Sequence, residues 1–370
     1  MLNIFNYDIS FIMGVLHMCS GMRRIDFRFD LLNRYEAKIG ELECHEARIS
    51  YGENRAVMRS AVFEARASLW RSIDFLSDRV RPHFILHMPD GGTVEWPLGV
   101  FLLESPRYQM LGADKTLIIG AYDKTFILEQ DRFTERFFIS RGSRVDEIIK
   151  RILSTSGLTF VDIAQSEMEF AEDMEYQIGK KKRDAVNELL RMLNFTPIHA
   201  DESGRLCAYN FTDPADRRVD LSYTSKRGGT VRPSLVESLD FAGRPNVFTR
   251  VALNIDGDEL SSTYTNDNPL HPLSTVSRRR SIVNFAQVDH MPDQVSLDAM
   301  TKREAIELSN AGEILTFQTP LMPGHGCFKT LYLDIPEVLD SPAKFLETAW
   351  TMDLRFDGVM SHEARRITRL

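Results

Sequence analysis

The sequence has few of the residues that mark disulfide-stabilised or nucleic-acid-binding proteins. Its four cysteines, Cys19, Cys44, Cys207 and Cys327, are scattered through 370 residues without a CxxC pair. That pattern favours reduced thiols in a protein made in a cytoplasm. Acidic residues (53) outnumber Lys and Arg (45), giving a net charge of -8, so the chain lacks the overall basic charge of a nucleic-acid-binding protein.

Motifs for chemistry are also missing. The sequence contains no GxxxxGK[ST] loop, no GxGxxG after a strand, no HExxH and no GxSxG. His83 and His87 would share one face of a strand, but no Cys or acidic residue nearby in sequence completes a metal site. Asp256-Gly257-Asp258 reads as a hairpin turn, because it lacks the ligand register of a calcium loop. We therefore expect no enzymatic activity, no cofactor and no metal.

Three sets of charged or nucleophilic residues each allow two interpretations. His325 and Cys327 could form a base and nucleophile, but no acid at local spacing would orient the base. The carboxylates at 167–175 could host a glycosidase pair, or form a solvated face. Arg278, Arg279 and Arg280 could contact phosphate or an acidic partner, or lie in a solvated loop.

The first 18 residues are apolar but do not resemble a signal peptide or a membrane span. No Lys or Arg precedes Asp8, and polar residues interrupt the run, so we expect no membrane anchor. As a helix, the segment would place its larger apolar residues on one face. These are Phe5, Ile9, Ile12, Met13 and Leu16. Either Phe5, Ile9, Ile12 and Leu16 dock on a partner, or the segment packs ordinarily or precedes a later start at Met13 or Met22.

Hydrophobic patterning predicts an α+β, mostly β protein. Residues 25–31 alternate apolar and polar, as a half-buried strand does, and Thr116–Tyr122 is a further strand. Four hairpins are expected around turns rich in Asp and Gly. They join 83–88 to 93–103, 195–200 to 206–211, 247–254 to 259–264, and 350–356 to 359–367. Three helices are expected, starting at Ser143 with Asp146 as a capping partner, over 184–194, and over 296–311.

The length predicts two to four domains at roughly 100–200 residues each. We expect an N-terminal apolar segment (1–22), a first β domain (23–131) and an α/β outer domain (132–200). A connecting hairpin region (201–245) and a second β domain (246–370) that contains the helix at 296–311 follow.

Three segments in order resemble a known family. They are Trp96–Pro106 (WPLGVFLLESP), Gly120–Lys124 (GAYDK), and Tyr264–Pro269 (YTNDNP) with Ser274–Arg280 (STVSRRR). Their order and spacing are similar to tail-tip and baseplate hub proteins of phages that infect Gram-positive bacteria, and the hairpin at 350–366 also looks similar.

The resemblance implies a structural role in a virion tail. It implies two small barrel-like, tube-type β domains per chain, a homotrimeric ring, and neighbours such as the distal tail protein, the tape-measure protein and tip or fibre proteins. DNA would pass through the channel without specific binding. Two alternatives stay open: a carbohydrate-binding adhesin of the tail tip, which the three tryptophans poorly support, and a tail-associated cell-wall hydrolase.

Overall fold

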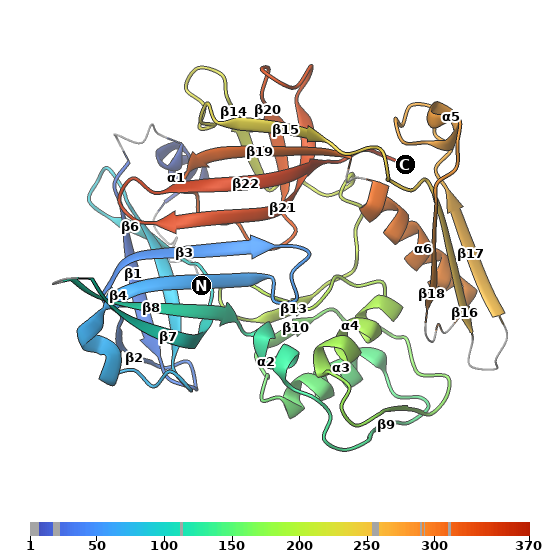
Figure 1. The fold of residues 1–370 in the computed structure, drawn as a ribbon, viewed down its shortest axis with the longest axis horizontal. Helices are drawn as coiled ribbons and strands as arrows, with labels where there is room; N and C mark the ends of the chain where they lie inside the picture. Colours follow the sequence, from blue (N-terminus) through green and yellow to red (C-terminus); the bar gives the residue numbers. More distant parts are fainter. Residues whose placement is uncertain are drawn as a thin grey trace.

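The computed structural model describes residues 7–17, 23–111, 114–253, 259–288, 291, 293–309 and 312–370. The protein is mostly β with a few helices, as expected. Its largest unit is a 14-stranded sheet whose main path runs β15-β19-β22-β21-β3-β4-β8-β7-β5-β1-β2. Two smaller units, one helical and one with three strands and a helix, lie beside it (Figure 1).

The N-terminal strands form one end of the large sheet. They are β1 (Ile25–Leu32), β2 (Lys38–Glu41), β3 (Cys44–Gly52), β4 (Arg59–Arg66), β5 (Arg79–His87), β6 (Thr93–Pro97), β7 (Phe101–Leu111) and β8 (Asp114–Asp123), with a 3-10 turn at Ala67–Arg71 after β4. The alternation in β4 and β5 places every second side chain in the core, including Phe63 and Phe84. The predicted turn at residues 89–92 does join β5 to β6 in an antiparallel hairpin.

The C-terminal strands continue the same sheet. They are β14 (Leu221–Thr224), β15 (Leu235–Leu239), β19 (Glu313–Pro320), β20 (Thr330–Asp334), β21 (Ala343–Leu354) and β22 (Val359–Arg366). The predicted hairpin around Asp357-Gly358 is confirmed as β21 and β22, and Asp357 takes a φ of 62° in its turn. β21 also pairs antiparallel with β3, which joins the two ends of the chain in one sheet and one core.

A helical unit follows β8. It contains α2 (Thr125–Gln130), β9 (Phe137–Ile139), α3 (Val145–Thr155), β10 (Val161–Ile163), β11 (Met174–Tyr176), α4 (Lys182–Met192), β12 (His199–Ala200) and β13 (Leu206–Ala208). Its apolar core is separate from that of the large sheet. Two of the predicted helices are α3 and α4, but the predicted capping box is wrong. Arg144 is the N-cap, and the Asp146 carboxylate instead contacts Arg144 and Lys150 while buried.

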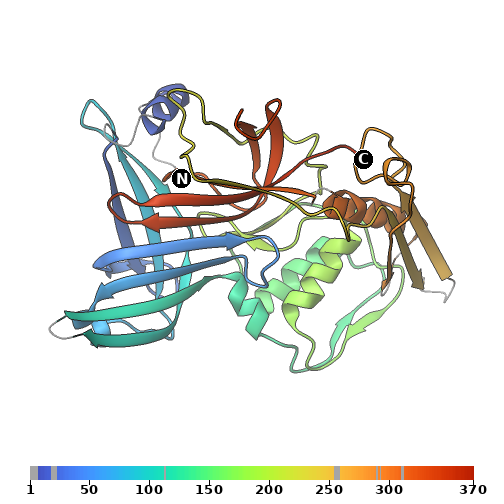
Figure 2. The same cartoon turned by 45° about the horizontal axis from the view of Figure 1, so that its top comes forward.

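A third unit comprises β16 (Val247–Leu253), β17 (Glu259–Thr265), the one-turn α5 (Thr275–Arg278), β18 (Val283–Val288) and α6 (Gln294–Ser309). α6 packs against β16 and β17 and closes a small core that includes Leu297 and Met300 (Figure 2). We expected residues 246–370 to form one β domain. The strands in that range belong to two sheets: β16–β18 form a sheet of their own, and β19–β22 join the large sheet.

The N-terminal helix α1 (Ile9–Leu16) packs on the protein itself. Ile12, Val15 and Leu16 are buried in the core of the large sheet, and Arg23 donates to the Leu16 carbonyl oxygen. Ile9 does not share that face, since it is 68% exposed, and Phe5 lies outside the described residues. None of the helices in the described ranges is long and apolar enough to cross a membrane.

Candidate functional site

A buried network of ionisable side chains lies inside the large sheet. His362 on β22 and His325 in the loop between β19 and β20 each place Nδ1 2.7 Å from a different oxygen of Glu347 on β21. The outer nitrogens are also occupied. His325 Nε2 lies 2.6 Å from the Tyr223 hydroxyl, and His362 Nε2 lies 2.8 Å from the Thr319 hydroxyl. Each ring nitrogen and each carboxylate oxygen therefore has a partner.

Burial controls the electrostatics of this network. It raises the pKa of the Glu347 carboxyl and of the Tyr223 hydroxyl, and it lowers the pKa of both imidazoles, to about 3 for His325. The arrangement expected near neutral pH has neutral histidines that donate Nδ1–H to the carboxylate and accept at Nε2. Such a network is costly to break, because any member left alone would be a buried polar group without a partner.

Within the described part of the chain, one group has potential metal-ligand atoms close enough together to hold an ion. It consists of His325, Glu347 and His362. Its geometry is that of hydrogen bonds. Ligands bound 2.0–2.1 Å from a tetrahedral zinc ion lie roughly 3.3 Å apart, whereas the nitrogen–oxygen distances here are 2.7 Å. All three side chains are buried. The network is suited to holding three segments together and has no position open to a substrate.

The suspected pair of His325 and Cys327 does not form a nucleophile and its base. Both nitrogens of His325 are occupied by Glu347 and Tyr223, so neither can accept a proton from the thiol. Burial also raises the pKa of Cys327, which disfavours the reactive thiolate. Sequence reasoning missed Glu347 and His362 because they come from two later strands, at no fixed spacing from His325.

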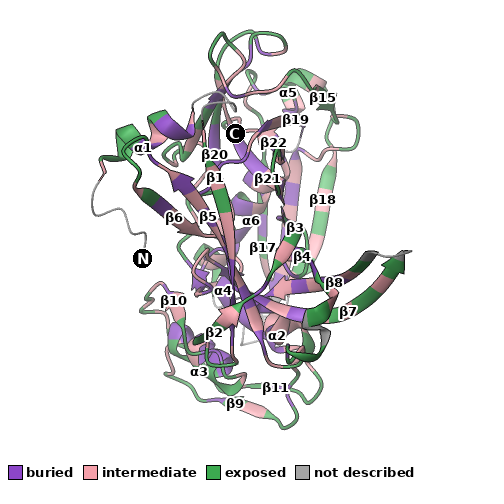
Figure 3. Ribbon diagram, turned by 90° about the vertical axis from the view of Figure 1, so that its left-hand side faces the viewer, coloured by how far each residue is buried: buried purple, intermediate pink, exposed green. Residues whose placement is uncertain are grey.

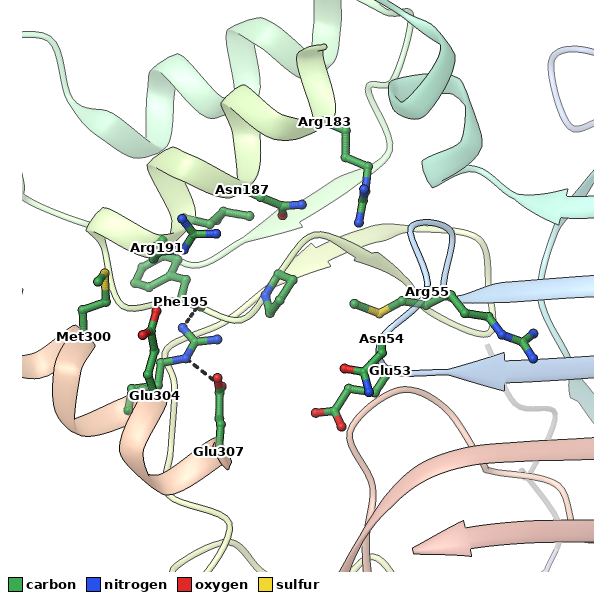
Figure 4. A pocket seen from close by; sticks show the side chains of 14 residues that line it. Glu53, Asn54, Arg55, Arg183, Asn187, Arg191, Phe195, Met300, Glu304 and Glu307 are labelled. Atoms are coloured by element: carbon green, nitrogen blue, oxygen red, sulfur yellow. Dashed lines mark hydrogen bonds and ion pairs between the residues drawn. The ribbon is translucent and has the colours of Figure 1, made fainter. Parts of the chain in front are cut away.

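An open cleft separates the three structural units (Figure 4). It has a volume of about 330 Å³ and is lined by the turn after β3, one stripe of α4 and one stripe of α6. The α4 stripe is Arg183, Asn187 and Arg191, spaced four residues apart, so these side chains project from one face. Glu53 and Asn54 point into the cleft from the turn opposite.

Ion pairs and one backbone contact hold the cleft walls. Arg303 on α6 donates to the Phe195 carbonyl oxygen at 2.5 Å and pairs with Glu307 at 2.8 Å. Glu53 pairs with Arg365 on β22 at 3.0 Å, and burial raises the pKa of its carboxyl. The cleft thus has charges of both signs that are largely committed to one another, and it lacks a paired acid and base aimed at a common point.

The histidines on β5 do have acidic neighbours, which were not evident from the sequence. Pairing of β1 with β5 brings Asp30 within 3.2 Å of His83 and Asp26 within 2.6 Å of His87. Arg28 and Lys38 also contact Asp30, at 3.0 and 2.7 Å. The group is therefore a partly buried ion-pair network on the sheet, in which cations already neutralise the Asp30 carboxylate.

The arginine run has a structural use at its first residue. Arg278 donates to the carbonyl oxygens of Arg244, Phe241 and Ala242, which ties α5 to the chain before β16. Arg279 and Arg280 are exposed, and Arg279 takes a φ of 51° just after α5. The carboxylates of 167–175 line an exposed stretch, as in the solvated-face interpretation, and Asp256-Gly257-Asp258 lies outside the described residues.

The fold itself has known relatives, although the sequence matches no protein-family model and no curated protein. A tail protein from Neisseria meningitidis MC58 has a TM-score of 0.66 at 11% identity, covering 92% of this chain and 97% of that one. The 43 kDa tail protein of prophage MuSo2 from Shewanella oneidensis has a TM-score of 0.62 at 12% identity, covering 92% and 98%. The chain has the fold of phage tail proteins.

Prophage tail protein gp18 from Listeria monocytogenes EGD-e shares the fold too, with a TM-score of 0.55 at 11% identity, covering 91% of this chain and 94% of that one. The three similar proteins come from three different bacterial genera. The tail-protein fold is therefore maintained at very low sequence identity, because many apolar sequences can satisfy the same pattern of buried positions.

Proposed function

We propose that this protein is a structural subunit of a phage-type tail, the hub at the tail tip or baseplate that closes the tail tube and connects it to distal tip or fibre proteins. The observation that carries the proposal is the likeness in fold along almost the whole chain, matched to tail proteins of similar extent. The hub-like segments Trp96–Pro106 and Tyr264–Pro269 support it independently.

The proposed working form is a ring-shaped homotrimer in the virion, assembled after synthesis in the host cytoplasm. Each chain would contribute two tube-type units, one from the N-terminal and one from the C-terminal strands, so that three chains continue a hexameric tube. The pairing of β21 with β3 supports this arrangement, because it sets the two units side by side in one sheet. The distal tail and tape-measure proteins are the proposed neighbours.

The ring would surround the path of the DNA, and its lumen should be neutral or acidic so that phosphates do not bind to Lys and Arg. Arg278 is compatible with this idea, since its guanidinium is engaged with three backbone carbonyl groups. A structure of the assembled tail in which Arg278, Arg279 and Arg280 line the lumen would contradict the proposed lumen charge.

Immunogold imaging of intact tails tests the proposal. An antibody against this chain should label the tail tip, and particles from a strain that lacks the gene should have no closed tip. Labelling of the capsid, or particles that lack the chain entirely, would refute the structural role. Image averages of the tip also test the copy number, because a sixfold or single-copy arrangement is incompatible with a trimer.

A further inference from the structure

The cleft beside α4 continues into a second hollow. The first part has a volume of about 330 Å³ and the second about 230 Å³, and Glu53, Asn54 and Arg303 line both. We call the two parts together the interunit groove. In the side view of Figure 3, α4 lies between α3 of its own unit and α6 of the third unit, and it contacts both. A ligand in the groove would therefore touch all three units.

The carboxylates that line the interunit groove are already neutralised by the protein itself. Each of the three has an arginine partner. The pairs are Glu53 with Arg365 at 3.0 Å, Glu304 with Arg250 at 2.5 Å, and Glu307 with Arg303 at 2.8 Å. The acidic side chains of the groove are therefore compensated before any ligand arrives, and they leave its remaining positive charge without a partner.

Three arginines of the interunit groove have no ion-pair partner among the described residues. They are Arg55, Arg191 and Arg217. Arg217 donates only to backbone, to the carbonyl oxygens of Thr212 at 2.9 Å and Phe328 at 3.3 Å. Burial lowers the pKa of Arg217, so its charge is only partly compensated. The groove thus has an excess of positive charge, although the whole chain has a net charge of -8.

The stripe on α4 offers hydrogen-bond donors to the groove and no free acceptor. The Asn187 Oδ1 accepts the backbone N–H of Ile198 at 3.0 Å, which leaves the Nδ2 amide hydrogens without a partner among the described residues. Arg183 uses Nη1 to pair with Glu129 at 3.1 Å, and its guanidinium points from α4 toward the cleft (Figure 4). Arg191 is exposed and unpaired. A matching ligand must therefore supply acceptors.

The spacing of these donors matches an extended peptide. Residues four apart on a helix are about 6 Å apart along its axis, and alternate residues of an extended chain are about 6.4–6.8 Å apart. Carboxylates at every second residue would therefore face Arg183, Asn187 and Arg191 in turn, and Arg–carboxylate hydrogen bonds are among the strong ones. The residues between would face the opposite wall, where Met58 lies, and so would be small or apolar.

We propose that the interunit groove binds an extended acidic segment of a partner protein, whose carboxylates at alternate residues contact Arg183, Asn187 and Arg191. The binding site goes beyond the proposed hub role, because it defines the chemistry of one partner and does not require a ring. A nucleic acid fits less well, since three carboxylates line the groove and would lie close to its phosphates.

Fluorescence anisotropy with two labelled peptides of equal charge tests the proposal on the purified full-length chain. One peptide alternates Glu and Ala, and the other has the same residues as a block of Glu followed by a block of Ala. The alternating peptide should bind at least fivefold more tightly, because only its carboxylates match the donor spacing on α4. Its affinity should fall as salt is added, since salt screens the ion pairs. Equal affinity for both peptides would overturn the proposal.

Variants of the stripe locate the binding. Asn187→Asp keeps an acceptor for the Ile198 N–H but replaces the Nδ2 donor with a negatively charged oxygen, so the affinity should fall at least tenfold. Arg191→Ala should lower the affinity at least fivefold, and it carries the test if Asn187→Asp lowers the melting temperature, because Arg191 is exposed. Arg227→Ala is the control for charge. Arg227 is exposed in the loop after β14, and its removal should leave the affinity unchanged.

Three further outcomes would overturn the proposal. They are no binding of the alternating peptide, the same loss of affinity in Arg227→Ala as in Arg191→Ala, and tighter binding of a single-stranded oligonucleotide that Arg191→Ala abolishes. The last result would make a nucleic acid the occupant. The hub role is tested separately by tail imaging. A chain that binds the peptide but is absent from tails would refute the hub alone, and a chain at the tail tip that binds no peptide would refute the groove site alone.

Discussion

Trp350 on β21 lies directly opposite Tyr51 on β3, with the two ring centroids 6.0 Å apart. Both side chains are buried, and the guanidinium of Arg59 lies over the Trp350 ring at 5.6 Å. This contact is at the junction where the last strands of the chain join the first ones. Neither group of strands can bury its apolar face without the other, so the two should fold together.

Removing the Trp350 side chain at this junction should destabilise the whole sheet. We expect Trp350→Ala to lower the free energy of unfolding by about 3–5 kcal/mol, since it removes a large buried aromatic side chain. Urea unfolding monitored by circular dichroism measures the change. Tyr35→Ala, at a position 75% exposed, is the matched control and should have little effect. Separate transitions for the N-terminal and C-terminal strands would contradict the shared core.

The buried histidine predicts a pH dependence with a definite sign. His325 has a pKa of about 3 when folded, against 6.5 for an ordinary histidine, so the unfolded chain binds more protons between these values. Its contribution to stability is therefore lost as the pH falls from about 6.5 toward 3, by up to roughly 1.4 kcal/mol per pH unit.

His325→Asn should remove this contribution, although it also weakens the fold at neutral pH because Glu347 and Tyr223 lose a partner. Urea unfolding of both proteins at pH 7 and pH 5 measures it. The difference in free energy of unfolding between the wild-type protein and His325→Asn should be smaller at pH 5 than at pH 7, because only the wild-type protein loses the contribution of His325. A difference that is the same at both pH values would show that His325 is not buried in its neutral form.

The docking of the N-terminal helix α1 can be tested by comparing its buried face with its exposed face. Ile12→Asp should destabilise the protein by more than about 2 kcal/mol, because it places a carboxylate in the apolar core. Ile9→Asp, on the exposed side of α1, should be close to neutral. Thermal unfolding of the two variants measures the difference. Equal melting temperatures would mean that α1 does not dock on the core in solution.

Arg303 should control how firmly α6 is held to the helical unit. Arg303→Ala removes the hydrogen bond to the Phe195 carbonyl oxygen and leaves this acceptor without its charged donor. Hydrogen exchange should become faster in α6 and around Phe195, with little change in β3 and β4. Lys302→Ala, at the adjacent exposed position, is the control. Unchanged exchange in the Arg303 variant would mean that other contacts suffice.

Peptidoglycan zymography checks the expected lack of hydrolytic activity. The purified chain should give no cleared band, because the buried network has no open position and the cleft has no acid and base aimed at a common point. A cleared band that a single His or Glu substitution abolishes would reverse this expectation and favour a cell-wall hydrolase.

Local patterns in the sequence determined much of the secondary structure. Alternation predicted β1, and the strands expected at 83–88 and 116–122 correspond to β5 and β8. Asp-Gly turns predicted the hairpins of β5 with β6 and β21 with β22, because these depend on residues close in the chain. The motif at Trp96–Pro106 and those that follow it indicated the tail-protein resemblance. Helix periodicity also placed α4 and α6 within two residues of their observed starts.

The tertiary structure alone decided which strands became neighbours. The pairing of β21 with β3, the separate sheet of β16–β18, and the meeting of His325, Glu347 and His362 all join residues far apart in sequence. A period of two shows which side chains of a strand face a core, but it cannot show which strand lies alongside. That choice depends on the joint burial of apolar faces from the whole chain.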